Sequence, residues 1–486
     1  MALDQQRNWD VSMAENLERA LQISHATRTS QPRDTSTTTA TTSSPSLSAT
    51  EWTTPPIYLP DEILLAILTH VASSPHRRAA QTTLASCTLL SHQWFRAATP
   101  LLYAHPHLYG HNFAPFAAAI CPSINLHVRP SPLAELVKTL NMASMVHQIN
   151  RTATARLLGR TKGNLEEFVA PQASFAINCL PALGKCRKLR VLDLSLVSES
   201  PPLPDLFKTL ARLDDLRTLR LPRSAGFGAH HKASALVEIW PPRLAHLSLS
   251  GGIDAHFLHG VVAFPQTLRS LTIEHCPLAK GYALVHLLRT AVRPLQNLAS
   301  LKIRHMPRLS SRALDDVLFL LPQLKELSVS VDYITPAMFD EGHFNHLIDS
   351  LPIVGIQNLR PGCSASDDAP LMGLRQHALE TLELTSSGNT GLEDKISPID
   401  ILIAIDEGSL PRLRRVRTAR SLRWQSGGVV QEAEALGDVL REKGRKEWVE
   451  EAGAGEELCG VEVEGGVLGN EERPWEGGRG WSVVDG

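Results

Sequence analysis

Leucines and other aliphatic residues recur through the middle of the chain in the pattern L-x-x-L-x-L. The clearest copies start at Leu189, Leu216, Leu244, Leu268, Leu298, Leu324 and Leu379. Weaker copies start at Val137, Leu165, Leu351 and Leu413, so that successive starts lie 24 to 34 residues apart. A single copy cannot bury its own apolar face, whereas stacked copies share one core. The pattern therefore predicts stacked repeats, each with a short strand whose leucines point inward.

This interval is typical of leucine-rich repeats, which are roughly 20–29 residues long. Residues 311–321, after one strand, have the apolar spacing of an outer helix. Regular repeats carry Asn or Cys three residues after the last leucine-type position of each copy. In this sequence only Cys276 provides such a residue, so the turns are expected to be uneven. The predicted fold class is an α/β solenoid, an irregular leucine-rich-repeat horseshoe. An ordinary sheet protein with aligned leucines is the alternative.

Residues 57–103 have the spacing of three short helices. Pro60 suits the first turn of a helix, and two acidic residues follow it at the positive helix end. An apolar stripe then runs along this first helix through Ile63, Leu64, Ile67, Leu68 and Val71. A second helix is expected around Leu84. A third is expected from about Leu90 to Ala98, ending before Pro100 because the residue before a proline disfavours helix.

This stretch resembles an F-box at Leu59–Leu64, Ile67-Leu68, Cys87, Ser91 and Trp94, and its continuation at 97–103 resembles the version in many fungal F-box proteins. The resemblance implies docking on the SKP-type adaptor of a cullin ubiquitin ligase. The residues that it places in the adaptor's apolar groove are Leu59, Pro60, Ile63, Leu64, Ile67 and Leu68, and Trp94 would brace the third helix. Alternatively, the helices only cap the first repeat, as solenoids require. Both roles are compatible.

A shorter motif near the start resembles a ubiquitin-interacting helix. Leu17, Ala20, Leu21 and Ser24 have its spacing, in which alanine permits close approach and serine supplies a hydrogen bond. Among the ten residues before Leu17 only Asp10 and Glu15 are acidic, and basic residues follow the motif, so a chance match is the alternative.

Composition and charge set the boundaries of the folded part. Twelve of the 16 residues in 35–50 are Ser or Thr, which predicts a disordered linker. Residues 431–486 carry 15 acidic and 6 basic residues, which leaves +7 for the rest of a chain whose net charge is −2. The expected division is a disordered segment 1–54 with a short helix at about 10–26, an F-box 55–105, a connector 106–129, repeats 130–424, and an acidic tail 425–486 that is partly helical or disordered.

Other function classes lack support in the sequence. The balanced charge argues against a nucleic-acid partner, no apolar run could span a membrane, and no secretory signal is visible. The seven cysteines have no disulfide or zinc spacing. No nucleophile elbow, phosphate loop or metalloprotease motif is present. We therefore expect no catalytic residue, metal or cofactor, and a cytoplasmic or nuclear protein.

The face of the strands between the core leucines is the expected target surface, because side chains alternate along a strand. The candidate residues on this concave face are Asp193, Arg220, Glu274, Lys302, Arg304, Glu326 and Glu383, with His246, Arg415 and Arg417 in the same rows. Taken with the resemblance, the sequence predicts the substrate-recognition subunit of an SCF-type ubiquitin ligase. A repeat scaffold without a ubiquitin role is the alternative, and an enzyme whose site no motif reveals is a third.

Overall fold

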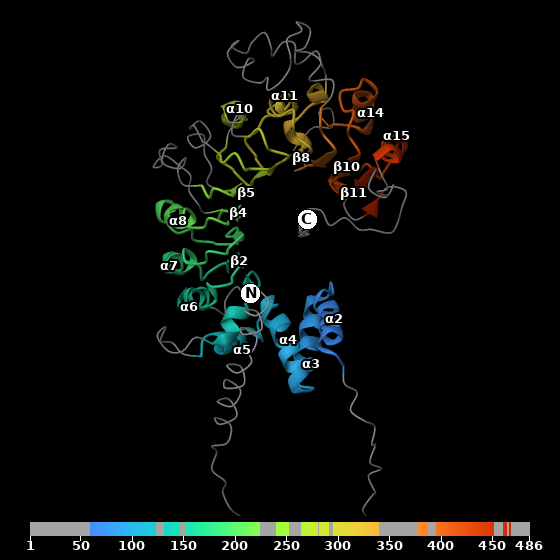
Figure 1. Cartoon of the computed structure of the whole chain (residues 1–486). Coiled ribbons are helices and arrows are strands. Elements are labelled where there is room, and N and C mark those ends of the chain that lie inside the picture. The colour runs from blue at the N-terminus through green and yellow to red at the C-terminus, as the bar shows by residue number, and fades with distance from the viewer. Residues whose placement is uncertain are drawn as a thin grey trace, which may run out of the picture. The chain divides into compact units, whose positions relative to one another are not determined.

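The computed structural model describes residues 59–122, 131–145, 151–223, 240–251, 264–279, 281–290, 295–339, 377–386, 395–451, 460–463 and 466–467. The chain divides into two compact units, Met1–Phe168 and Val169–Gly486, which are described one after the other. Figure 1 labels the elements of both.

The described part of the first unit begins with three helices and ends in two short strands. Its elements are α2 (Asp61–Ala72), α3 (Arg77–Cys87), α4 (His92–Ala104), α5 (Phe113–Ile120), the 3₁₀ helix η1 (Pro132–Leu136), β1 (Thr139–Asn141), α6 (Arg151–Thr161) and, at the boundary, β2 (Glu167–Val169). Helices α2, α3 and α4 pack on one another. Their core consists of Leu64, Leu68, Leu84 and Ala98. The three helices predicted for residues 57–103 are therefore present.

The third helix is longer than the sequence predicts, because α4 continues through Pro100 to Ala104. A proline inside a helix removes one backbone hydrogen bond and costs about 3 kcal/mol. Leu101 and Leu102 pack against the core of the three helices, and this burial offsets the cost. The Thr99 hydroxyl also donates to the Phe95 carbonyl at 2.7 Å, in the turn before Pro100. The prediction that the helix ends before Pro100 is wrong because packing outweighs the local preference.

The second unit is a run of parallel strands with helices between them. Its strands are β3 (Val191–Asp193), β4 (Thr218–Arg220), β5 (His246–Ser250), β6 (Ser270–Glu274), β7 (Ser300–Arg304), β8 (Glu326–Ser330), β9 (Thr381–Thr385), β10 (Arg415–Thr418), β11 (Gly460–Val463) and β12 (Gly466–Val467). The order in the sheet follows the order in the chain, and only β12 runs antiparallel to its neighbour.

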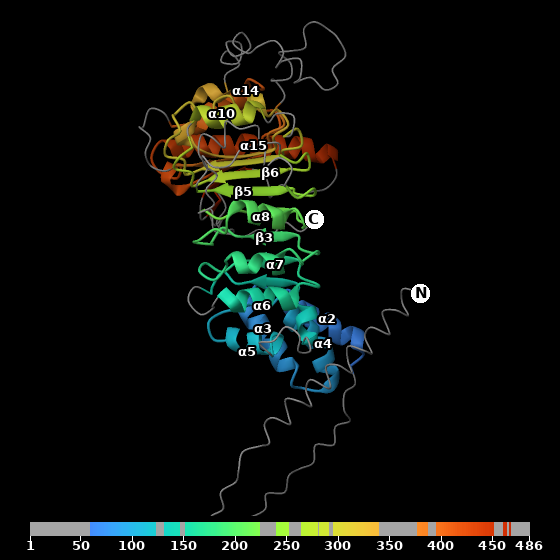
Figure 2. The same ribbon diagram turned by 90° about the vertical axis from the view of Figure 1, so that its left-hand side faces the viewer.

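Helices fill the connections between these strands. They are η2 (Ile177–Cys179), α7 (Leu180–Leu183), α8 (Leu203–Leu210), α10 (Gly281–Thr290), α11 (Val317–Leu320), η4 (Val331–Tyr333), η5 (Pro336–Phe339), α14 (Pro398–Asp406), η7 (Arg420–Leu422) and α15 (Val429–Glu451). Helices α7 and α8 cover one face of the strands, as the two views together show (Figures 1 and 2). The coarse prediction of an α/β fold is confirmed. Of residues 311–321 only Val317–Leu320 is helical, so the predicted outer helix is shorter there.

The register explains why the leucine pattern is so regular. One core residue of each strand from β3 to β10 is paired with its counterpart on the next strand: Leu192, Leu219, Leu247, Leu271, Leu301, Leu327, Leu382 and Val416. All eight are buried. Each buried aliphatic side chain contributes about 1.5–3 kcal/mol relative to an exposed one.

The copy that the sequence predicts at Leu351–Ile356 has no place between its neighbours. Strand β8 pairs directly with β9, in the register Leu327↔Leu382. A strand between them would take up the hydrogen bonds that β8 and β9 make with each other. Residues 340–376 themselves lie outside the described residues. The two-period gap is therefore an insertion between consecutive strands.

Regular structure also continues past residue 424, where the sequence placed the end of the repeats. Helix α15 buries Ala433, Leu436 and Leu440 and packs on α14 and β11. Strand β11 pairs in parallel with β10. The beginning of the acidic segment is thus part of the second unit, because three apolar residues at helical spacing give it a buried face.

A buried histidine ties the start of β9 to the preceding repeat. His377 Nε2 lies 3.2 Å from the Leu321 carbonyl, and its Nδ1 accepts the Leu379 amide at 3.0 Å. This arrangement requires a neutral ring, protonated on Nε2. Burial holds the pKa of His377 below its ordinary value of 6.5, although the hydrogen bonds to carbonyls oppose this effect.

We expect the free energy of unfolding to fall as the pH is lowered from 7.5 to 5. In the unfolded chain His377 takes up a proton near its ordinary pKa of 6.5, whereas in the folded chain it resists protonation. The stabilisation is therefore complete above pH 6.5 and is lost as the pH falls toward the lower folded-state pKa. One such group contributes at most about 1.4 kcal/mol per pH unit. Urea unfolding at several pH values, compared with His377→Asn, measures it, and an equal slope in the variant would contradict this role.

Candidate functional site

Two isoleucines on α2 are exposed at the place where the resemblance expects an adaptor. Ile63 is 50 % exposed and Ile67 is 42 % exposed. Pro60, one turn before Ile63, is also exposed, and Leu59 is half-buried. Because residues at i, i+3 and i+7 share one side of a helix, Pro60, Ile63 and Ile67 form a single apolar strip. We call these three residues the α2 strip.

Leu64 and Leu68 were expected to enter the adaptor's groove as well, and the structure corrects this. Both have no exposed surface and form the centre of the three-helix core. The apolar stripe along the first helix contains more residues than the three-helix core buries. Leu64 and Leu68 therefore hold the helices together, while Ile63 and Ile67 remain on the surface.

Trp94 and its neighbour Gln93 position the beginning of α2. The Trp94 side chain is half-buried against the three-helix core, and its amide is capped by the Ser91 hydroxyl at 3.3 Å. The side-chain nitrogen Nε2 of Gln93 donates to the Leu59 carbonyl at 2.8 Å and to the Asp61 carboxylate at 2.6 Å. These contacts hold the residues on either side of Pro60, the first residue of the α2 strip, against α4. The position of Trp94 is compatible with the predicted bracing of the third helix.

Three other exposed leucines on this module were missed by sequence reasoning. Leu89 and Leu90, in the loop between α3 and α4, are 85 % and 64 % exposed. Leu65 on α2 is 49 % exposed. It lies on the other flank of the buried stripe, since each residue advances about 100° around the helix. A run of adjacent leucines gives no signal of which of them faces solvent.

Six of the seven predicted target residues occupy two adjacent rows on the sheet, and Glu326 lies in the row before them, paired with Ser300. We call these three rows the strand face. The strand pairing places Asp193, Arg220, Lys302 and Glu383 in one row, together with Ser248, Thr272, Ser328 and Arg417. Glu274 and Arg304 are paired in the next row. The register thus brings together residues from strands far apart in the sequence.

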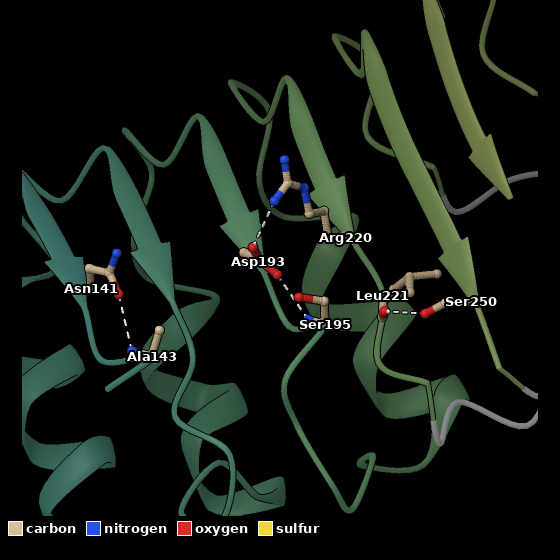
Figure 3. Close-up of polar contacts among 7 residues, drawn as sticks. All are labelled: Asn141, Ala143, Asp193, Ser195, Arg220, Leu221 and Ser250. Carbon is tan, nitrogen blue, oxygen red and sulfur yellow. Dashed lines mark hydrogen bonds and ion pairs between the residues drawn. The ribbon is translucent and has the colours of Figure 1, made fainter. Parts of the chain in front are cut away.

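Asp193 is used inside the sheet. It is buried, and its carboxylate accepts the Ser195 amide at 2.9 Å and pairs with the Arg220 guanidinium at 3.2 Å, as Figure 3 shows. Asn141 makes the equivalent turn contact after β1, where its side-chain oxygen accepts the Ala143 amide at 3.0 Å (Figure 3). In these two repeats the turn after the strand is therefore stabilised by an Asp or Asn that is the last residue of the strand. Regular repeats use an Asn or Cys that follows the strand instead.

Arg304 and Glu383 form a second, more buried ion pair. Their side chains are 14 % and 10 % exposed. The Arg304 guanidinium donates to the Glu383 carboxylate from one nitrogen and to the Ser328 hydroxyl from Nε at 2.9 Å. The pair thus crosses β8 and joins β7 to β9. Of the seven predicted target residues, Asp193, Arg220, Arg304 and Glu383 serve such internal pairs, while Glu326 is exposed and Glu274 and Lys302 are half-buried.

Nothing in the described part of the chain has the arrangement of a catalytic or metal site. Burial raises the pKa of the Cys276 thiol to about 12, so the thiol stays protonated, and its Sγ donates to the Glu274 carbonyl at 3.3 Å. No group of three or more His, Cys, Asp or Glu side chains converges among the described residues. Within the same residues, no helix is both long enough and apolar enough to cross a bilayer. The ubiquitin-interacting motif at Leu17–Ser24 lies outside the described residues and stays a prediction.

No family model matches this chain. A protein of Saccharomyces cerevisiae named F-box protein YDR306C is 31 % identical over 338 residues, which cover 69 % of this chain and 63 % of that protein. The protein pof5 of Schizosaccharomyces pombe is 29 % identical over 311 residues, which cover 64 % of this chain and 77 % of pof5.

Among solved structures, the crystal structure of the yeast Rad7 and Elc1 complex matches 74 % of this chain and 88 % of the matched chain, with 16 % identity and a TM-score of 0.43. This chain spans less than two thirds of the length of the S. cerevisiae F-box protein. The predicted resemblance of this chain to fungal F-box proteins is confirmed by the sequence similarity, which extends over about two thirds of the chain.

Proposed function

We propose that this protein is the substrate-recognition subunit of an SCF-type ubiquitin ligase. The α2 strip binds the SKP-type adaptor, and the repeats present a target protein on the strand face, the concave side of a horseshoe. The supporting observation is the apolar strip on α2, within a chain similar to fungal F-box proteins. Catalysis is by proximity, because holding a target beside the charged conjugating enzyme raises the effective concentration of its lysines.

The exposure of apolar side chains on the three helices favours this function over a cap alone. A cap needs its apolar residues buried against the first repeat. Ile63 and Ile67 are instead exposed, although Leu64 and Leu68 already complete the core. Exposed apolar residues that are grouped on one side of a helix are typical of a binding surface.

The test is reconstitution from purified components. The full chain is mixed with the SKP-type adaptor, alone and with the cullin, and the mixtures are separated by size exclusion. We expect a stoichiometric complex with the adaptor and, through it, with the cullin. A folded chain that elutes alone at micromolar concentrations of both partners would leave the scaffold function in its place.

The strand face is tested by exchanging two of its charges. Lys302 is half-buried and Glu326 is exposed on the neighbouring strand, and the described contacts assign neither an ion pair. We expect Lys302→Glu with Glu326→Lys to retain the fold and adaptor binding, because surface substitutions usually change stability by less than about 0.5 kcal/mol. The set of proteins ubiquitinated in cells should change, as measured by quantitative mass spectrometry of ubiquitin remnants. An unchanged set would place target binding elsewhere.

A further inference from the structure

The last turn of α4 occupies the place of a repeat before the first strand. In the second repeat, Glu166 and Glu167 donate their amides to the Lys138 carbonyl at 2.7 and 3.1 Å. In the first repeat, Lys138 donates its amide to the Ala104 carbonyl at 2.9 Å. Ala104 is the final residue of α4, and the last carbonyls of a helix lack partners inside it. The helix end therefore supplies the acceptor that a preceding repeat would supply.

The same bonding pattern recurs in the second unit, which shows that it belongs to the repeat. Arg217 and Thr218 donate to the Arg190 carbonyl, and Lys325 and Glu326 donate to the Ala299 carbonyl. The amides at the start of each of these strands thus donate to the carbonyl of the residue just before the preceding strand. At β1 that residue is Ala104, the end of α4, which is the third of the three helices.

Side chains reinforce this junction at β1. His105, directly after α4, lies 2.9 Å from the Thr139 hydroxyl through its Nδ1. The Ser144 hydroxyl, which follows β1, donates to the Leu108 carbonyl at 2.7 Å. Tyr103 near the end of α4 stacks on Phe116 of α5 with ring centroids 6.3 Å apart.

Helix α3 is tied to the same segment. The Gln81 side-chain oxygen accepts the His107 amide at 2.7 Å. The Arg78 guanidinium lies over the Tyr109 ring, 4.9 Å from its centroid. The described part of the expected connector, residues 106–122, is thus packed, with Leu108, Phe113 and Phe116 buried.

We propose that the three helices and the first repeat form one cooperative folding unit, so that occupation of the α2 strip is linked to the stability of β1. The three helices have a small core of their own, and β1 has three residues and is the first strand among the described residues. Neither part has enough buried surface to be stable alone. A ligand that binds only the folded unit stabilises all of it by the same free energy. The linkage to the adaptor rests on the proposed function, whereas the cooperativity does not.

The cooperativity is tested by amide hydrogen exchange on the full chain. In Leu64→Ala, which removes a core side chain of α2, the amides of α4 and of residues 139–141 should exchange faster by the same factor, at least tenfold. Leu247→Ala removes a matched core leucine from β5 and should leave residues 139–141 unchanged. Faster exchange in α4 with unchanged exchange in β1 would overturn the proposal. If Leu64→Ala does not fold, the milder Leu64→Val replaces it under the same criterion.

The linkage is tested by adding the purified SKP-type adaptor to the unchanged protein. At an adaptor concentration of 100 times the Kd, amides of residues 139–141 that exchange by opening of the whole unit should slow about a hundredfold. Adaptor binding that protects α2 without protecting β1 would overturn the inference and leave the proposed function standing. Absence of adaptor binding would overturn the proposed function and the linkage, while the Leu64→Ala comparison would still decide the cooperativity.

Discussion

The double substitution Ile63→Glu with Ile67→Glu should lower the affinity for the SKP-type adaptor at least a hundredfold. Only about half of each isoleucine is exposed, so its burial in an interface contributes about 0.7–1.5 kcal/mol, and every 1.4 kcal/mol is a factor of ten in affinity. Glutamate would also place an unpaired charge in an apolar contact, which adds to the loss. Titration calorimetry with the purified adaptor measures the change.

The control for this prediction lies on the same helix. Leu65 is 49 % exposed, much as Ile63 and Ile67 are, but it lies on the other flank of the buried stripe. Leu65→Glu should bind the adaptor with nearly unchanged affinity. Circular dichroism and thermal unfolding of all variants should match the parent, because none of the three side chains is in the core. Equal loss of binding in the control, or retained binding in the double variant, would contradict the assignment of the α2 strip.

Glu383→Ala should destabilise the second unit by about 3–5 kcal/mol. Arg304 and Glu383 are almost buried, and removal of one partner leaves the other charge buried without compensation. The loss would also release Arg304 from the contact that joins β7 to β9 across Ser328. Urea unfolding monitored by circular dichroism measures the change in free energy.

Two further variants separate the ion pair from general effects of substitution. Glu326→Ala, on the strand between β7 and β9, removes an exposed glutamate and should change stability by less than about 0.5 kcal/mol. The double variant Arg304→Met with Glu383→Leu removes both charges and should recover most of the loss, because an apolar pair of similar volume replaces a buried ion pair at little cost. A Glu383→Ala variant as stable as Glu326→Ala would show that the pair contributes nothing.

The repeats could be predicted from the sequence because each one carries the same signal. Leu192, Leu219 and Leu247 stand at matching positions of L-x-x-L-x-L, and the structure pairs them in register. The copy at Leu351–Ile356 fits the same pattern, but the pairing of β8 with β9 leaves no place for it. A short aliphatic pattern does not show which strands are neighbours, since that depends on hydrogen bonds between segments distant in the chain.

The residues of the candidate site were harder to predict from the sequence than the repeats. The sequence showed a stripe through Ile63, Leu64, Ile67 and Leu68, but which two of these residues are buried depends on where α3 and α4 pack. Likewise, Asp193 lies between two core leucines and so should face outward. The structure turns its carboxylate to the Ser195 amide and the Arg220 guanidinium. Such contacts join residues whose separation in sequence follows no fixed spacing.

The extension of the sheet beyond residue 424 has a consequence for shortened forms of the protein. Strand β11 covers the edge of β10, and α15 packs on β11 from the same C-terminal segment. A chain cut at residue 424, where the sequence placed the end of the repeats, would expose the amides and carbonyls of β10 as an open edge. Open edges pair readily with other strands, and natural proteins protect them for this reason. The C-terminal segment thus protects the repeats from self-association by backbone pairing.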